Sequence, residues 1–475
     1  MQDYFEPSTK DNQGAYANYA GHDATGQTLA YSLIGQDSWL WDYGDRDHII
    51  DHIVEAESSG SMKYGISNPA EGYQCLGSES RLATALKDIT SGLLSASASG
   101  SWFTAHPLTA YSAETLFTTD KAPSLIDSYF DNWHTHCPIL HRPSFDMESV
   151  SPSLLAAMIL MGAVYSQPHL AMAARTCLDA AEEYIFGHPD YTRLSDPVSR
   201  KKAGLVDMSP LQAAYTIAVL QQWDTHEESR RRIRLSRFPS IVRVARNLGL
   251  TGLRYSHSPV SDADCDDQDC RAAVRTEESI RLMNWIFLVD TSHAIFHQTL
   301  PLLKLDELTV SLPNSEDSLS CLSAQSRYWG KRIDSSYKIP SVADGITLLM
   351  GDAWELGRFG LLEHLDLFIL ISALHEIIFR AYRAHTLDRR YKTVIQRALS
   401  RWRYLWDMNI EGSSGLEKGF RGFYTQADEW WYLANLFLMD DCPVLKQASD
   451  DSSGRDCMDG VYNLIKQFSD LDIAG

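Results

Sequence analysis

The chain has 475 residues, a hydrophobic fraction of 44% and a net charge of −20 at pH 7. This composition is ordinary for a globular protein with a sizeable core, while the acidic balance disfavours direct binding to nucleic acid, whose phosphates attract clustered Lys and Arg. The eight cysteines form no C-x-x-C pair, no signal peptide is recognisable, and the longest apolar run, residues 154–164, is too short to span a bilayer, so we expect an intracellular protein with free thiols and no membrane partner.

Residues 1–121 are expected to form an acidic, largely disordered region. Within it, residues 37–57 alternate acidic side chains with aromatic and aliphatic ones, beginning with Trp39, Leu40 and Trp41. This alternation is typical of an activation segment, in which charges keep apolar groups solvated and available to a partner. A flexible linker with a short amphipathic helix is the alternative, and both interpretations stay open. A further short helix is expected at residues 78–94.

Residues 122–440 predict a large all-α domain. Long segments of this region carry apolar residues at helical spacing, and none shows sustained period-two alternation. Ser151 followed by Pro152 predicts an N-cap and a first turn, which lead into a buried helix at residues 154–165. Beyond this domain, residues 441–475 are expected to be an acidic flexible tail with a short terminal helix.

Local signals place the boundaries of several helices. Ser209 and Pro210 repeat the cap-and-proline arrangement, and Gly249 is expected to end a helix in a left-handed conformation. Thr276, followed by two glutamates, predicts the start of another helix. Further helices are expected at residues 361–382, 389–406 and 425–439.

Nitrogen and sulfur donors are concentrated in one short segment, as His134, His136, Cys137 and His141. Zinc sites usually take their ligands from two separated pairs, and no second pair is present here. Pro138 and Pro143 also force an extended, turning path on the segment. Packing of these side chains at a turn is therefore favoured. A helical metabolic enzyme or a metal-dependent enzyme using this cluster is kept as the alternative.

Other enzyme signals are weak. The Asp-rich run at residues 262–269 lacks the Gly and the Glu that a calcium-binding EF-hand loop requires. The common nucleotide-binding, hydrolase and zinc-protease motifs are absent. We therefore expect no catalytic residues and no metal ligands in this chain.

The densest basic run contains five arginines, which are Arg230, Arg231, Arg232, Arg234 and Arg237. Such a run fits a nuclear-localisation signal or a phosphate contact. Glu227 and Glu228 lie directly before it, so an ion-paired start of a helix is the alternative. Both interpretations stay open at this point.

The segment 129–145 combines an aromatic pair, a histidine, a Pro-Ile-Leu-His-Arg-Pro run and a final aromatic residue. These residues are Tyr129, Phe130, His134, Pro138, Ile139, Leu140, His141, Arg142, Pro143 and Phe145. The pattern resembles the opening motif of the fungal-specific transcription factor domain, also called the middle homology region. Three further blocks, at residues 154–165, 211–250 and 275–313, follow in the order of that family. The third block is most similar to the subtype associated with two-Cys/two-His zinc fingers.

The resemblance implies a nuclear transcription regulator rather than an enzyme, with metabolic or secondary-metabolite genes as its targets. It implies partners in the transcription machinery or a DNA-binding partner, and a small-molecule effector held between helices, for which residues 402–406 and 430–432 would form walls. No finger spacing precedes the motif. We therefore expect no cofactor in this chain, zinc only in an upstream finger module, and DNA contact through that module or a partner.

Overall fold

The computed structural model describes residues 80–100, 103, 106–196, 206–222, 227–255, 267–314, 341–359, 362–413, 422, 424 and 427–439, with only the backbone described at 267–270 and 411–413. The expected activation segment at 37–57 and the tail at 441–475 lie outside these residues. All regular elements in the described ranges are helices, which confirms the all-α fold class. Residues 77–445 belong to one compact unit.

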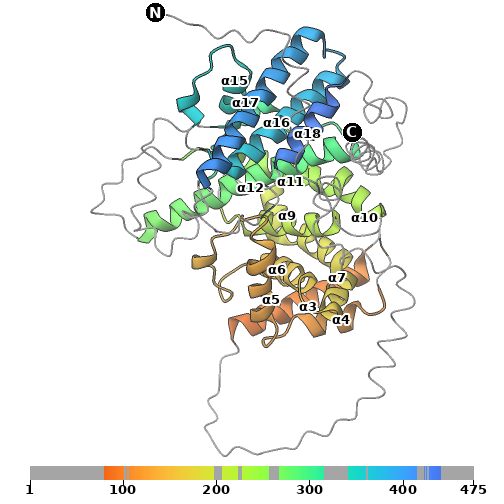
Figure 1. Ribbon diagram of the computed structural model, residues 1–475. Coiled ribbons are helices and arrows are strands. Elements are labelled where there is room, and N and C mark those ends of the chain that lie inside the picture. Colours follow the sequence, from red (N-terminus) through yellow and green to blue (C-terminus); the bar gives the residue numbers. More distant parts are fainter. Residues whose placement is uncertain are drawn as a thin grey trace, which may run out of the picture. The chain divides into compact units, whose positions relative to one another are not determined.

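The N-terminal helices of this unit surround one buried helix, α6 (Figure 1). Their bounds are α3 (Arg81–Ser99), α4 (Thr109–Leu116), α5 (Ala122–Ser128), α6 (Pro152–Val164), α7 (Pro168–Gly187), α8 (Pro189–Ser195) and α9 (Ser209–Gln222). Helix α6 packs against α3, α5, α7 and α9. It is apolar on every side, and all its residues from Ser153 to Val164 are buried, as expected for a helix at the centre of a core.

The folded body begins before the boundary expected at residue 122. Helices α3 and α4 both pack against α7, and α3 buries Leu86, Ile89 and Leu93. The apolar residues of α3 recur every three or four positions, so they form one stripe that needs a partner surface. Part of the region expected to be disordered therefore belongs to the core. The physical reason is this stripe, which outweighs the polar composition around it.

The middle of the chain leads into a long helix that connects two groups of helices. Its elements are α10 (Glu227–Arg232), α11 (Phe238–Asn247) and α12 (Asp267–His297). Helix α12 packs against α11 and against α16 (His364–Arg383) of the C-terminal group, and Figure 1 shows it between them. Helix α12 therefore connects the two groups of helices.

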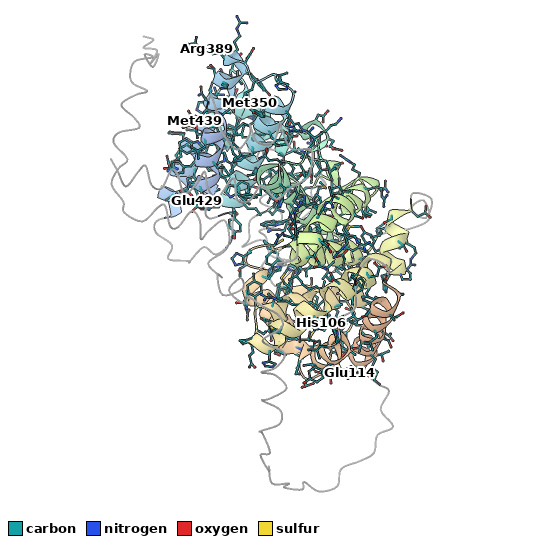
Figure 2. The ribbon with its side chains drawn as sticks, turned by 90° about the vertical axis from the view of Figure 1, so that its right-hand side faces the viewer. His106, Glu114, Met350, Arg389, Glu429 and Met439 are labelled. Atoms are coloured by element: carbon teal, nitrogen blue, oxygen red, sulfur yellow. The ribbon has the colours of Figure 1, made fainter. Side chains whose placement is uncertain are left out.

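The C-terminal group is built around α16, which packs against α12 and three further helices. These are α15 (Val342–Met350), α17 (Arg389–Ser413) and α18 (Ala427–Phe437). Side chains fill the space within both groups (Figure 2). No helix within the described residues has both the length and the apolarity needed to cross a membrane.

The helix boundaries test the capping predictions. The Ser151 hydroxyl accepts a hydrogen bond from the backbone N–H of Leu154, and Gly249 has a φ of 72°, so both predictions are confirmed. The cap predicted at Ser209 is wrong, because Asp207 accepts hydrogen bonds from both the backbone N–H and the hydroxyl of Ser209. The start predicted at Thr276 is also wrong. Its hydroxyl donates to the carbonyl of Ala272 inside α12, which begins at Asp267.

Candidate functional site

The segment 129–145 folds as an aromatic cluster at the end of α5. Residues Tyr129–Trp133 form one π-helical turn, which the backbone N–H of His134 closes on the Tyr129 carbonyl at 2.9 Å. The Phe130 ring then makes edge contacts with three rings of the motif, at centroid distances of 5.3 Å to Tyr129, 5.2 Å to His134 and 5.3 Å to Phe145. The spacing of aromatic residues in the motif thus corresponds to one packed cluster centred on Phe130.

Short-range polar contacts fix the path of the motif after this cluster. The Nε2 of His134 lies 2.7 Å from the Leu140 carbonyl, so this nitrogen carries the hydrogen. The Nδ1 of His141 lies 2.7 Å from the Ser144 hydroxyl. Arg142 pairs with Asp131 at 2.7 Å. The two histidines therefore act as hydrogen-bonding residues that hold the turn.

Two long-range hydrogen bonds tie the motif to other helices. Glu278 of α12 accepts a bond of 2.8 Å from the backbone N–H of His141, and Gln212 of α9 donates one of 3.0 Å to the Ile139 carbonyl. Both bonds engage backbone groups, which an extended segment cannot satisfy by itself. The motif is therefore a connector that joins α9 and α12 to the turn after α5.

A glycine allows α5 and α6 to approach at the start of the motif. A Cβ atom at Gly162 would lie 1.9 Å from the Leu125 carbonyl oxygen, a distance that a side chain cannot occupy. The hydroxyl of Ser128 donates to the Gly162 carbonyl at 2.9 Å across the same contact. This small residue of the block at residues 154–165 thus has a packing role, which is to bring α5 against the core helix.

Burial sets the protonation of the ionisable groups around the motif. It lowers the pKa of His134 to about 4, against a favourable hydrogen bond to the Leu140 carbonyl, so the ring is neutral at pH 7. Burial also raises the pKa of the Cys137 thiol far above its usual range. The pKa of Glu278 is raised by burial to about 7, although the His141 N–H favours the charged form. The buried His134 and Cys137 of the motif are therefore neutral at pH 7, while Glu278 titrates near this pH.

The four donors of the His/Cys cluster contact different neighbours. His134 and His141 are hydrogen bonded as described, the His136 ring lies 6.4 Å from the Trp133 ring between centroids, and the Cys137 sulfur lies 3.7 Å from the hydroxyl of Tyr215. Among the residues that the structure describes, no group of three or more His, Cys, Asp or Glu side chains is placed to hold a metal ion. The geometry therefore lends no support to the metal-dependent alternative.

The basic run after α9 is folded against an acidic surface of α7. Glu182, which is fully buried, receives bonds from Arg232 at 2.8 Å and from Arg237 at 2.7 Å. Arg237 also pairs with Glu183 at 2.9 Å, and Arg234 is buried. The nuclear-localisation interpretation of the five arginines stays a prediction, which these contacts make less favourable for three of them. Ion pairing and burial withdraw Arg232, Arg234 and Arg237 from the surface that an import receptor would contact.

The Leu-Pro pair that closes the third sequence block is held by a buried ionic cluster on α12. Glu277 and Arg281 are both fully buried, with an N–O distance of 2.7 Å. Glu277 also accepts from the backbone N–H of Asn314 at 3.0 Å and from the hydroxyl of Tyr255, while Arg281 donates to the Asn314 carbonyl at 2.5 Å. The residue after Pro313 is thereby fixed to α12. Sequence reasoning identified these residues as a family block but not as partners.

Two of the aromatic residues expected to line an effector pocket are core residues, whereas Tyr404 and Tyr432 are about half exposed. Trp402 and Trp406 are fully buried and stacked at a centroid distance of 5.4 Å, and the Trp402 indole donates to the Leu367 carbonyl. The rings fill the space between α16 and α17. Trp402 and Trp406 therefore have a packing role, while an effector pocket with walls at residues 402–406 and 430–432 stays a prediction.

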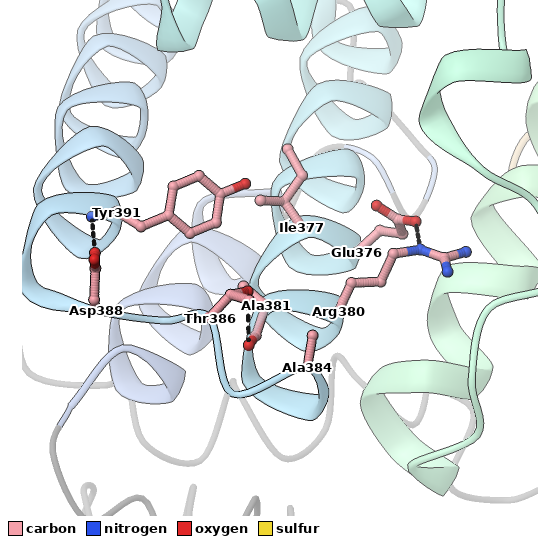
Figure 3. Close-up of a pocket in the computed structure, with 8 residues that line it drawn as sticks. All are labelled: Glu376, Ile377, Arg380, Ala381, Ala384, Thr386, Asp388 and Tyr391. Carbon is pink, nitrogen blue, oxygen red and sulfur yellow. Dashed lines mark hydrogen bonds and ion pairs between the residues drawn. The ribbon is translucent and has the colours of Figure 1, made fainter.

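A cavity of about 470 Å³ lies elsewhere, between the end of α16 and the first turn of α17. Figure 3 shows the residues that line it, which are Glu376, Ile377, Arg380, Ala381, Ala384, Thr386, Asp388 and Tyr391. No motif in the sequence pointed to Glu376 as a site residue. A signal was nevertheless available, since a glutamate within an apolar helical stripe requires a partner.

Comparison with known proteins identifies the family. A family profile described as "Fungal specific transcription factor domain" matches residues 126–404. The chain is 29% identical over 359 residues to Transcription factor verF of Penicillium polonicum. The aligned region covers 68% of this chain and 47% of that relative. The chain is also 23% identical over 201 residues to the Nicotinate catabolism cluster-specific transcription factor of Emericella nidulans. That aligned region covers 42% of this chain and 22% of the relative.

The extent of these matches differs between the family and the individual relatives. The chain spans about half or less of the length of these two relatives. No solved structure matches the chain. The family profile, in contrast, covers more than half of the chain and includes the opening motif, the core helix α6 and the ionic cluster on α12. The chain therefore belongs to the fungal-specific transcription factor domain family.

Proposed function

We propose that this chain is a transcription regulator that acts in the nucleus. The helical body would be the regulatory module, and residues 37–57 would be an activation segment that this body restrains or presents to the transcription machinery. DNA would be contacted through an upstream zinc-finger module or a DNA-binding partner. The proposed targets are genes of metabolism or secondary metabolism, and no catalytic activity is proposed.

The observation that carries this proposal is the family match over residues 126–404. The names of the relatives support the finer points, because both are called transcription factors and one is named for a nicotinate catabolism cluster. The net charge of −20 supports indirect contact with DNA, since phosphate repels an acidic surface.

A reporter assay tests the proposal. The full chain would be fused to a heterologous DNA-binding domain whose site precedes a reporter gene in a fungal host. We expect the fusion to change reporter output several-fold relative to the DNA-binding domain alone. Deleting residues 37–57 from the fusion should remove any activation, whereas deleting residues 447–459, an acidic segment without the aromatic alternation, should not.

The same experiment has clear contrary outcomes. A fusion that reaches the nucleus and leaves the reporter unchanged would show that the chain is not a regulator. The proposed route to DNA is tested separately with purified chain and duplex DNA. Sequence-specific binding with a steep salt dependence would show direct contact by this chain and would remove the need for a partner.

A further inference from the structure

The cavity between α16 and α17 is open to solvent, and its lining combines apolar and charged side chains. Ile377 and Ala381 give it an apolar wall, and the Glu376 side chain, with a relative exposure of 2%, is also part of the lining. Figure 3 shows the Tyr391 ring extending from α17 toward α16 at the level of Glu376 and Ile377. A volume of about 470 Å³ is within the range of pockets that hold small organic ligands.

Two polar atoms in this cavity have unused hydrogen-bonding capacity. One carboxylate oxygen of Glu376 accepts from Arg380, and its other oxygen has no hydrogen-bond partner among the described residues. The Tyr391 hydroxyl likewise has no partner within the described part of the chain, although its backbone N–H donates to Asp388 at 2.7 Å. A carboxylate oxygen that no described protein group donates to is available as an acceptor for a ligand that carries an N–H or O–H group.

The charges around the cavity favour a cation. Glu376 and Asp388 contribute two carboxylates to the lining, and Arg380 contributes one guanidinium. Arg380 is also committed to two backbone carbonyls, at 3.0 Å to Pro301 and 2.7 Å to Leu303. Burial raises the pKa of Glu376, Arg380 opposes the rise, and the nearby Asp290 and Asp306 add to it. The lining therefore has an excess of negative charge.

We propose that this cavity binds a small organic cation, specifically a protonated amine on an apolar body. The ammonium group would donate to the free oxygen of Glu376 and to the Tyr391 hydroxyl. The apolar body would lie against Ile377, Ala381 and Ala384.

Arg380 connects this site to the turn after α12 through its hydrogen bonds to the carbonyls of Pro301 and Leu303. The carbonyls that Arg380 holds belong to the turn after α12, where Asp290 accepts from the backbone N–H groups of Leu302 and Leu303 at 3.0 and 2.7 Å. Arg246 of α11 donates to the Leu302 carbonyl at 2.6 Å in the same turn. A cation that competes with Arg380 for Glu376 therefore acts on a turn that joins α11, α12 and α16.

The binding proposal stands on the cavity, while its regulatory consequence rests on the proposed function. Binding would be measured by calorimetry on the full chain with three probes of one shape: 2-phenylethylamine, 2-phenylethanol and phenylacetate. We expect the amine to bind at least tenfold more tightly than the neutral alcohol, and the acid anion to show no saturable binding.

Variants separate the role of each group. Glu376→Gln removes the charge and should weaken amine binding at least tenfold, and Tyr391→Phe should weaken it several-fold. Ala384→Leu fills the mouth of the cavity, leaves the ion pair intact and should abolish binding without lowering Tm. Glu114→Gln is the matched control, because Glu114 lies on α4 at the far end of the unit from Arg389 (Figure 2), and it should bind like the wild type.

Each result decides between the proposals. Absence of saturable amine binding to the wild type, equal affinity for the alcohol, or unchanged binding by Ala384→Leu would overturn the site, even with the reporter fusion active. Conversely, amine binding that follows the expected variant pattern, with a reporter fusion that is inactive in the nucleus, would establish the site and overturn the proposed function. With both intact, the amine should change reporter output in the wild type but not in Ala384→Leu.

Discussion

Glu278 accepts a hydrogen bond of 2.8 Å from the backbone N–H of His141, and this bond joins two parts of the chain that lie 137 positions apart. It links the opening motif of the family to α12, the helix that packs against both groups of the unit. Because one partner is a backbone group, the contact depends on the path of the motif rather than on the identity of residue 141. The carboxyl of Glu278 is therefore a sensitive point for both stability and pH dependence.

We expect Glu278→Gln to flatten the pH dependence of folding. The pKa of Glu278 is raised from 4.5 to about 7 in the folded state, so the folded protein holds a proton that the unfolded chain loses between these values. The free energy of unfolding contributed by this group therefore falls as pH rises from 4.5 to 7, by about 3 kcal/mol at most. Glutamine keeps an acceptor for the His141 N–H and does not titrate. Urea unfolding at several pH values measures the difference, and parallel curves for both proteins would contradict this assignment.

We expect Gly162→Ala to destabilise the protein strongly. Its Cβ would meet the Leu125 carbonyl at 1.9 Å, and relief requires that α5 and α6 move apart, at a cost of about 3 kcal/mol. Gly187→Ala is the matched control, since a Cβ there has nothing within 4 Å and alanine favours a helix by up to about 1 kcal/mol. Thermal unfolding of both variants checks the pair. Equal Tm values would show that the close approach of α5 and α6 is not required.

The buried pair of Glu277 and Arg281 should show coupling. Arg281→Met leaves a buried carboxylate without its counter-ion and should cost about 3 to 5 kcal/mol. The double variant with Glu277→Gln should be more stable than Arg281→Met alone, because a neutral amide oxygen still accepts from Tyr255 and Asn314. A double-mutant cycle in urea gives the coupling energy, expected at about 1 to 3 kcal/mol. Additive losses would show that the two charges act independently.

Substitutions in the basic run after α9 should affect stability differently according to whether the arginine is ion paired or exposed. Arg232→Ala removes a partner of the fully buried Glu182 and should cost about 2 kcal/mol, whereas Arg231→Ala, at an exposed position, should change stability by less than about 0.5 kcal/mol. We also expect Arg231→Ala to leave the nuclear fraction of a fluorescent fusion unchanged. Loss of nuclear accumulation in that variant, with stability intact, would support the run as an import signal.

Metal analysis tests the alternative based on the His/Cys cluster. Purified chain should contain no stoichiometric zinc or iron, because His134, Cys137 and His141 each contact a different neighbour. His136→Ala should therefore leave the metal content unchanged. One equivalent of zinc or iron in the wild type, lost in His136→Ala, would support a metal site and contradict the packing role of the motif.

Local signals in the sequence were sufficient to predict a helix end where the deciding interaction is between a residue and the backbone next to it. Ser151 caps α6, and Gly249 adopts the left-handed conformation that ends its helix region, as their residue types predict. The helix start predicted at Thr276 was wrong because its local pattern fits two different structures. A threonine before two glutamates fits a helix start, but its hydroxyl can equally bond within a helix that began nine residues earlier, at Asp267. The choice between them depends on contacts that the local pattern does not contain.

The sequence by itself determined the helical class, the core helix and the family, because apolar periodicity and an ordered motif are properties of the chain. The tertiary structure alone decided that α3 and α4 belong to the folded body, that Arg232 and Arg237 are withdrawn onto Glu182, and that Glu376 faces a cavity with Tyr391. In each case the partner is distant in sequence. Whether a charge is solvated, paired or left open to a ligand depends on which helix packs against it, and only the assembled core fixes that neighbour.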